Sequence, residues 1–224
     1  MRPVDKGHKD KEYRPYNSAK RDLIEAIGPY CSYCERNIEH AGAVEHKQPK
    51  GRKESQHLKY SWDNFLLGCI NCNSIKGSKE VNDSNVADFV WPDVDDTYHM
   101  IQYDPVTLMP SPADNLSEKD KERVSRLIEL VGLDRAVPKE GSLTYEKASD
   151  TRVEVRKKTA EEARSYKEMY LNLLEEAKPA FISVLEILVR KSGCWSIWMH
   201  ELEDIPEIRT ALLRCLPGTR TDCF

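Results

Sequence analysis

Four cysteines stand in two C-x2-C pairs, and their spacing suits metal binding: Cys31, Cys34, Cys69 and Cys72. Each C-x2-C turn supplies two thiolates from one loop, and two turns complete the tetrahedral ligand set that Zn²⁺ prefers. A redox-active dithiol normally needs a single C-x2-C pair, so the favoured interpretation is a structural zinc ion. The other three cysteines have no such spacing and are predicted to be buried or incidental thiols: Cys194, Cys215 and Cys223.

A second group of residues lies between the cysteine pairs and within the second pair's helix, and its side chains suit phosphodiester hydrolysis. That reaction needs a base that takes a proton from the attacking water and a cation that offsets the negative charge developing at the phosphate. His46 is the predicted base, because an imidazole titrates near neutral pH. Glu45 and Asn73 offer the oxygen ligands that Mg²⁺ or Mn²⁺ prefer. The predicted phosphate contacts are Lys47, Lys50, Arg52, Lys53 and Lys76.

The basic stretch has an ordinary alternative explanation as a solvated turn. A Glu-His pair is likewise often a surface pair, and an Asn before an apolar strand is often a turn residue. It is the order of these residues, enclosed by the cysteine pairs, that favours a common site.

The segments V-E-H-K-Q-P-K, W-D-N-F-L-L and C-N-S-I-K-G resemble the HNH nuclease family, whose fold is the ββα-metal fold. The matching residues are Glu45-His46, Asn64 and Asn73, and flanking cysteine pairs are typical of a large HNH subgroup. The resemblance implies that Asn64 hydrogen-bonds the loop that carries His46 and fixes the histidine ring.

Other segments, including M-R-P-V-D-K-G, F-V-W-P-D and L-P-G-T-R-T-D-C-F, resemble the PtuB-type HNH subunit of Septu and retron-associated anti-phage systems. The resemblance implies a cytoplasmic nuclease effector that works with a PtuA-type ATPase subunit of the ABC/SMC-like class. In retron systems a reverse transcriptase and its msDNA join the complex.

Several functions remain open. DNA is the favoured substrate and tRNA the alternative, because the same base and metal cut either backbone. A zinc-ribbon protein that binds nucleic acid or a partner without catalysis would have no use for the catalytic set. A toxin of the same fold that acts alone is a further alternative.

The elements that must position these residues indicate an α+β fold. We expect a zinc-stapled ββα-metal (HNH) module with an N-terminal arm and helix over 1–82, an irregular connector over 83–115, and a mainly α-helical partner-binding region over 116–224. No strand in the first part should exceed about five residues. Helices are predicted over 19–27, from the Ser117 cap to Gly132, and over 152–177, 179–189 and 207–216.

Charge and hydropathy limit the functions available. The net charge of −4 divides into 15 Lys and Arg against 11 Asp and Glu over residues 1–80, and 19 against 27 over the rest. This pattern excludes strong, indiscriminate nucleic-acid binding by the chain alone. The apolar segment 179–189 contains Glu186 and is shorter than the roughly 20 residues of a membrane span, so we expect no membrane association. An odd number of cysteines and a charged N-terminus without an apolar core predict an intracellular protein.

Overall fold

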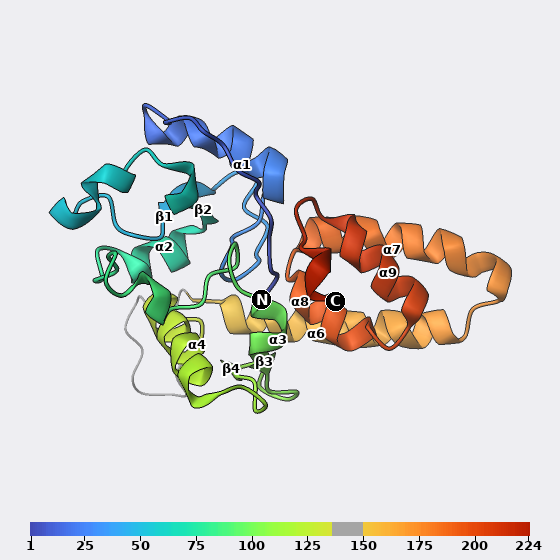
Figure 1. The fold of residues 1–224 in the computed structure, drawn as a ribbon. Helices are drawn as coiled ribbons and strands as arrows, with labels where there is room; N and C mark the ends of the chain where they lie inside the picture. Colours follow the sequence, from blue (N-terminus) through green and yellow to red (C-terminus); the bar gives the residue numbers. More distant parts are fainter. Residues whose placement is uncertain (136–149) are drawn as a thin grey trace.

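The computed structural model describes residues 1–135 and 150–224 (Figure 1). The part of the predicted 116–224 region that falls on 136–149 lies outside the described residues. Within the described ranges the chain combines helices with two small two-stranded sheets, which confirms the mixed α and β class. None of the described helices is long and apolar enough to cross a membrane.

The cysteine pairs and the candidate catalytic residues lie in or next to a small β-β-α arrangement. Strand β1 (Ala43–His46) pairs antiparallel with β2 (Phe65–Gly68), so that His46 lies opposite Phe65. Helix α2 (Ile70–Lys76) follows directly, and Cys69 caps it by accepting a hydrogen bond from the Cys72 amide at 3.4 Å. Each strand has four residues, as short as the sequence predicted.

The N-terminal arm and α1 cover one side of this arrangement. Helix α1 (Ala19–Ile27) ends at Gly28, whose φ of +75° is open to glycine, and both helix bounds agree with the sequence. The Ser18 hydroxyl does not cap the helix and donates instead to the Pro15 carbonyl. Val4 forms a β-bridge with Thr219, so the two ends of the chain lie side by side (Figure 1).

The middle of the chain packs with the residues that precede it. Helix α3 (Thr97–Met100) leads into a hairpin of β3 (Ile101–Tyr103) and β4 (Pro110–Pro112). Helix α4 (Glu118–Val131) begins at the predicted cap and ends at Gly132 in the left-handed conformation. Its apolar face joins the hydrophobic core around the β-β-α arrangement, here called the first core, where α4 packs against α2. The residues are Val124, Leu127, Ile128, Leu130 and Val131. The sequence had instead suggested a connector followed by a separate helical region.

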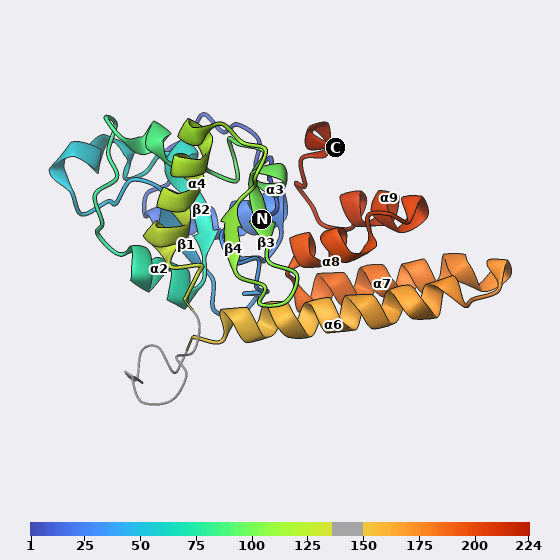
Figure 2. The ribbon, with the colours of Figure 1, turned by 90° about the horizontal axis from the view of Figure 1, so that it is seen from below.

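A second core is built by the C-terminal helices. Helix α6 (Arg152–Leu171) and α7 (Lys178–Ser192) lie antiparallel as a long hairpin that projects away from the β-β-α part (Figure 2). Helices α8 (Trp195–Leu202) and α9 (Pro206–Cys215) pack on it. The apolar stripe of α8 is buried: Trp195, Trp198, Met199 and Leu202.

The end of α6 is one place where the structure and the sequence differ. The predicted helix over 152–177 stops at Leu171, and a 3-10 turn over Glu175–Ala177 precedes α7. Further 3-10 turns are short and lie in loops: Tyr16–Ser18, Lys53–Leu58, Trp62–Asn64, Val86–Asp88 and Thr221–Cys223.

Candidate functional site

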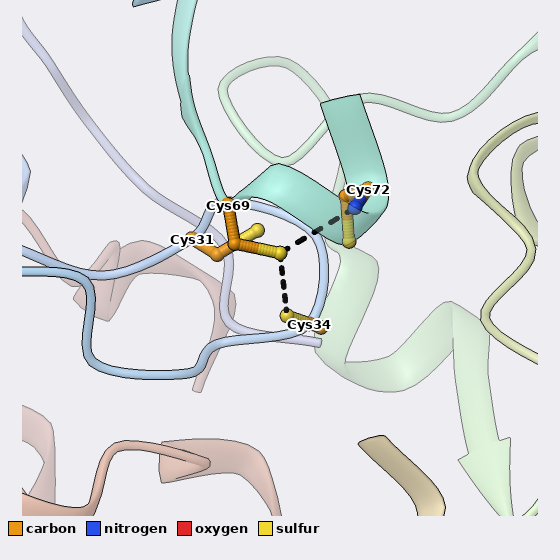
Figure 3. Close-up of side chains that lie close together, drawn as sticks. All are labelled: Cys31, Cys34, Cys69 and Cys72. Carbon is orange, nitrogen blue, oxygen red and sulfur yellow. Dashed lines mark hydrogen bonds between the residues drawn. The ribbon is translucent and has the colours of Figure 1, made fainter. Parts of the chain in front are cut away.

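The four cysteines of the two C-x2-C pairs converge in one buried cluster (Figure 3). Cys31 and Cys34 come from the turn before β1, Cys69 precedes α2, and Cys72 lies in the first turn of α2. The four sulfur atoms lie within 4.8 Å of one another, and the Cys34 and Cys69 sulfurs are 3.6 Å apart. Four Zn–S bonds of about 2.3 Å place tetrahedral sulfurs roughly 3.8 Å apart. The cluster therefore has the donor set and spacing to hold a structural zinc ion.

A buried arginine from the C-terminal helices supports this cluster. Arg152, at the start of α6, donates a hydrogen bond from Nη1 to the Cys72 sulfur at 3.2 Å. Its guanidinium also donates to the carbonyl oxygens of Val131 and Gly132 and pairs with Asp150 at 2.6 Å. A hydrogen bond from a cation favours the thiolate form of a metal ligand. Arg152 therefore joins the cluster, the end of α4 and the start of α6.

His46 stands at the end of β1, and its ring is held in one orientation. The ring meets the rings of Tyr16 and Phe65 edge-on, with centroids 4.9 and 5.0 Å away. Nε2 lies 3.0 Å from the Lys59 carbonyl oxygen. Because a carbonyl only accepts, Nε2 carries the proton of the neutral ring, and Nδ1 is left as an acceptor. Nδ1 makes no hydrogen bond with any described residue.

The surroundings of His46 keep the imidazole neutral. The side chain is almost fully buried, and this burial lowers the pKa of His46 to about 4. The hydrogen bond to the Lys59 carbonyl opposes the shift, and the positive charges of Lys50 and Lys76 add to it. At neutral pH the ring is therefore unprotonated and able to take a proton from a polarised water.

Asn64, just before β2, hydrogen-bonds the loop that follows His46. Its Oδ1 accepts from the Gln48 amide at 2.8 Å, and its Nδ2 donates to the Gln48 carbonyl at 3.0 Å. The Asn64 carbonyl also accepts from the Lys47 amide at 2.9 Å. These contacts fix the exit of β1, which is where the resemblance to HNH nucleases implies that an asparagine acts.

Glu45 and Asn73 lie close together on either side of Gly68. A Cβ added at Gly68 would stand 3.1 Å from the Glu45 Cβ and 3.6 Å from the Asn73 Cβ, so glycine allows this approach. The buried Glu45 Oε1 accepts no aligned hydrogen bond from any described residue, and its close partner is the Lys76 ammonium at 2.8 Å. Burial raises the pKa of Glu45, while the charge of Lys76 opposes the rise. The carboxylate is thus oriented toward a cation.

The structure corrects two of the predicted phosphate contacts. Lys76 is 1% exposed, and its ammonium donates to the His46 carbonyl at 2.7 Å besides pairing with Glu45. The Lys47 ammonium pairs with Asp93 at 2.8 Å, and Lys6 holds the same carboxylate. Both lysines balance buried carboxylates, so neither is free to reach a phosphate in this structure.

The other three predicted contacts keep some access to solvent. Arg52 donates two hydrogen bonds to the Ser78 carbonyl, Lys50 is half-buried, and Lys53 is exposed.

No family model matches the sequence, and no curated protein matches it closely.

Sequence reasoning missed the three residues that hold the site from outside: Tyr16, Lys59 and Arg152. Tyr16 and the Lys59 carbonyl contact His46 because of the path of their loops, and no sequence motif predicts that path. One signal was available for Lys76: it follows Asn73 by three residues and so shares a helix face with it.

The buried pair of Glu45 and Lys76 gives a stability prediction. Lys76→Met should lower the free energy of unfolding by about 3 kcal/mol or more, because it leaves a buried carboxylate without its cation. The double variant Glu45→Gln, Lys76→Met should recover much of that loss. Urea unfolding of the single and double variants measures both effects. Lys158→Met is the control, because Lys158 is paired with Glu162 at the surface and its loss should cost under about 1 kcal/mol. Equal stability of the Lys76 and Lys158 variants would contradict the prediction.

Proposed function

We propose that the chain is a metal-dependent HNH endonuclease of the PtuB type, an effector of bacterial anti-phage defence that hydrolyses nucleic-acid phosphodiester bonds, with DNA as the favoured substrate. The observation that carries the proposal is that one β-β-α arrangement carries Glu45 and His46 on β1 and Asn73 on α2, beside a four-cysteine cluster. A protein that only binds nucleic acid has no need for a neutral, oriented imidazole and a buried carboxylate on neighbouring residues of one strand.

In the proposed mechanism His46 is the general base. Its Nδ1 takes a proton from the attacking water, while the Lys59 carbonyl holds the ring through Nε2 and Asn64 fixes the loop that follows. As the water loses its proton, the imidazole becomes positively charged, and the same carbonyl stabilises that charge. The resulting hydroxide oxygen forms a bond to phosphorus while the bond from phosphorus to the leaving sugar oxygen breaks, and that leaving oxygen takes a proton from solvent water.

The residues beside His46 suit a divalent cation. Glu45 has a buried oxygen without an aligned donor, and Asn73 adds an amide oxygen from the neighbouring helix. These two residues would hold Mg²⁺ or Mn²⁺, which would offset negative charge at the phosphate. The Lys76 ammonium already balances Glu45, so a metal ion there would have to compete with it. In the proposal the cysteine cluster holds structural Zn²⁺.

The proposed partner is a PtuA-type ATPase, joined in retron systems by a reverse transcriptase and msDNA. The α6–α7 hairpin exposes apolar side chains at its tip and along α7 that suit docking: Met169, Leu171, Leu174, Val184 and Ile187. Because α4 belongs to the first core, the proposed partner-binding part is narrowed to the helices from α6 onward.

A cleavage assay tests the proposed function. The zinc-loaded full chain, alone and with the ATPase, is incubated with plasmid DNA and total tRNA in Mg²⁺, in Mn²⁺ or without added divalent metal. We expect Mg²⁺- or Mn²⁺-dependent cleavage of DNA, because a metal is needed to offset phosphate charge. Cleavage of tRNA alone would instead favour the retron-type effector. Binding without cleavage of either substrate in any metal would contradict the nuclease proposal and leave a zinc-ribbon binding protein.

A further inference from the structure

A strip of aromatic and cationic side chains adjoins His46 and lies outside the catalytic set described above. The N-terminal arm contributes Arg14 and Tyr16, and the loops between β1 and β2 contribute Lys50, Lys59 and Tyr60. These five residues are called the Tyr16–Tyr60 strip. Each of them is half-buried or exposed, so the strip faces solvent beside a histidine that is itself almost fully buried.

The strip is continuous with the histidine through two separate contacts. The Tyr16 ring lies 4.9 Å from the His46 ring, and the Lys59 carbonyl accepts the hydrogen bond from His46 Nε2. The arm itself is fastened to the loop, because the Tyr13 amide donates to the Tyr60 carbonyl at 3.0 Å. The two aromatic rings are therefore held at fixed places relative to the proposed base.

The faces of both rings are covered by cations on long flexible stems. Lys50 Nζ lies 4.3 Å from the Tyr16 centroid, and Arg14 and Lys59 lie 4.1 and 5.3 Å from the Tyr60 centroid. Arg14 also pairs with Glu12 at 2.8 Å. Lys50 and Lys59 have no carboxylate within ion-pair distance in the described ranges, unlike Lys47 and Lys76. A ligand can move these lysine and arginine side chains off the rings, and their positive charges then remain available to pair with the ligand.

Aromatic faces next to cations, two of which have no ion pair in the described ranges, suit one chemical class of ligand. Single-stranded nucleic acid offers bases that stack on aromatic rings and phosphates that pair with cations. Base pairs inside a duplex keep their faces stacked on each other, so a duplex cannot use the rings. Stacking of bases on the rings and pairing of phosphates with the cations would replace the cation–ring contacts of the free protein.

We propose that the Tyr16–Tyr60 strip binds unpaired nucleotides and delivers a single-stranded segment to His46. The inference deepens the proposed function and rests on it for the presence of a nucleic-acid substrate. The shared chemistry covers DNA and RNA, and the two are separated by the arms of the test.

Binding is measured by fluorescence anisotropy without added divalent metal, so that it does not depend on cleavage. The zinc-loaded full chain is titrated into labelled oligothymidylate, oligouridylate and a duplex of equal length. The leucine variants Tyr16→Leu and Tyr60→Leu should each raise the Kd for the single strands about tenfold, because a stacked base is lost. Tyr60→Phe keeps the ring and should bind as the wild type does. Lys158→Ala on α6 is the control for loss of a distant surface charge.

Each outcome decides the inference. Weaker single-strand binding in the leucine variants, with retention in Tyr60→Phe, supports it. Unchanged binding in the leucine variants, equal binding of the duplex, or no binding of any oligonucleotide overturns it. The proposed function fails separately, if the chain binds single strands through the strip but cleaves no nucleic acid in Mg²⁺ or Mn²⁺.

Discussion

Replacing His46 with glutamine is expected to slow phosphodiester cleavage by a factor of about 10² to 10⁴, which is the usual contribution of a general base. Glutamine has an amide that can still donate toward the Lys59 carbonyl, which His46 contacts at 3.0 Å, but it has no group that accepts a proton from water. The variant should therefore keep its fold and lose the chemical step. Single-turnover cleavage rates, with thermal unfolding measured on the same samples, test this expectation.

The pH dependence and a matched control sharpen the experiment. Because the lowered pKa of His46 lies near 4, the imidazole stays unprotonated well below neutral pH. Protonation of His46 should therefore not slow wild-type cleavage between about pH 8 and pH 6. His57 is an exposed loop histidine that lies 3.5 Å from Asp83, and His57→Gln should cut at the wild-type rate. Wild-type rates in His46→Gln, or a loss in both variants alike, would disprove the proposed base.

Local signals were sufficient to predict much of the fold. The Ser117 hydroxyl oxygen accepts a hydrogen bond from the Asp120 amide at 3.2 Å, and Gly132 ends the same helix. Helix α4 therefore begins and ends where its capping residues predict. The C-x2-C spacing predicted which four of the seven cysteines meet. In each case the deciding residues lie within a few positions of one another, or together make the four-ligand set that one Zn²⁺ ion would need.

Long-range packing was beyond the reach of such signals. The apolar face of α4 is compatible with either core, and only tertiary contacts show that it packs on α2. Likewise, the sequence around a lysine does not show which carboxylate its ammonium group pairs with in the folded chain. Lys76 and Lys47 read as phosphate contacts in the sequence, yet each neutralises a carboxylate that burial would otherwise make costly.

The cysteine cluster and the candidate catalytic residues are mechanically linked through one short helix. Cys69 caps α2 and Cys72 lies in its first turn, while Asn73 and Lys76 follow on the same seven-residue helix. A helix this short has little stability of its own. The positions of Asn73 and Lys76 relative to Glu45 therefore depend on whatever fixes the two cysteines.

Removing the metal from the cysteine cluster is expected to unfold the first core. Metal binding to structural cysteine sites contributes roughly 10 kcal/mol or more to folding, which matches or exceeds the whole stability of most domains. Without a metal ion, the four buried thiols would have no common partner to hold them together. The N-terminal end of α2, which carries Cys69 and Cys72, would then no longer be held in place. The Arg152 hydrogen bond to Cys72 would weaken as well, which carries the effect to α4 and α6. Near-UV circular dichroism during zinc chelation measures this loss.

Two cysteine variants separate the metal from general effects of cysteine replacement. Cys72→Ser removes a ligand and should lose bound zinc, the near-UV signal and the cooperative unfolding transition together, because three thiolates leave the tetrahedral site incomplete. Cys223→Ser changes a half-buried thiol near the C-terminus and should retain all three. A Cys72→Ser chain that unfolds cooperatively at the wild-type midpoint would show that the first core holds together without the cluster. In that case α2 and the residues it carries would have to be fixed by packing against α4 and by the contacts of Lys76 with β1.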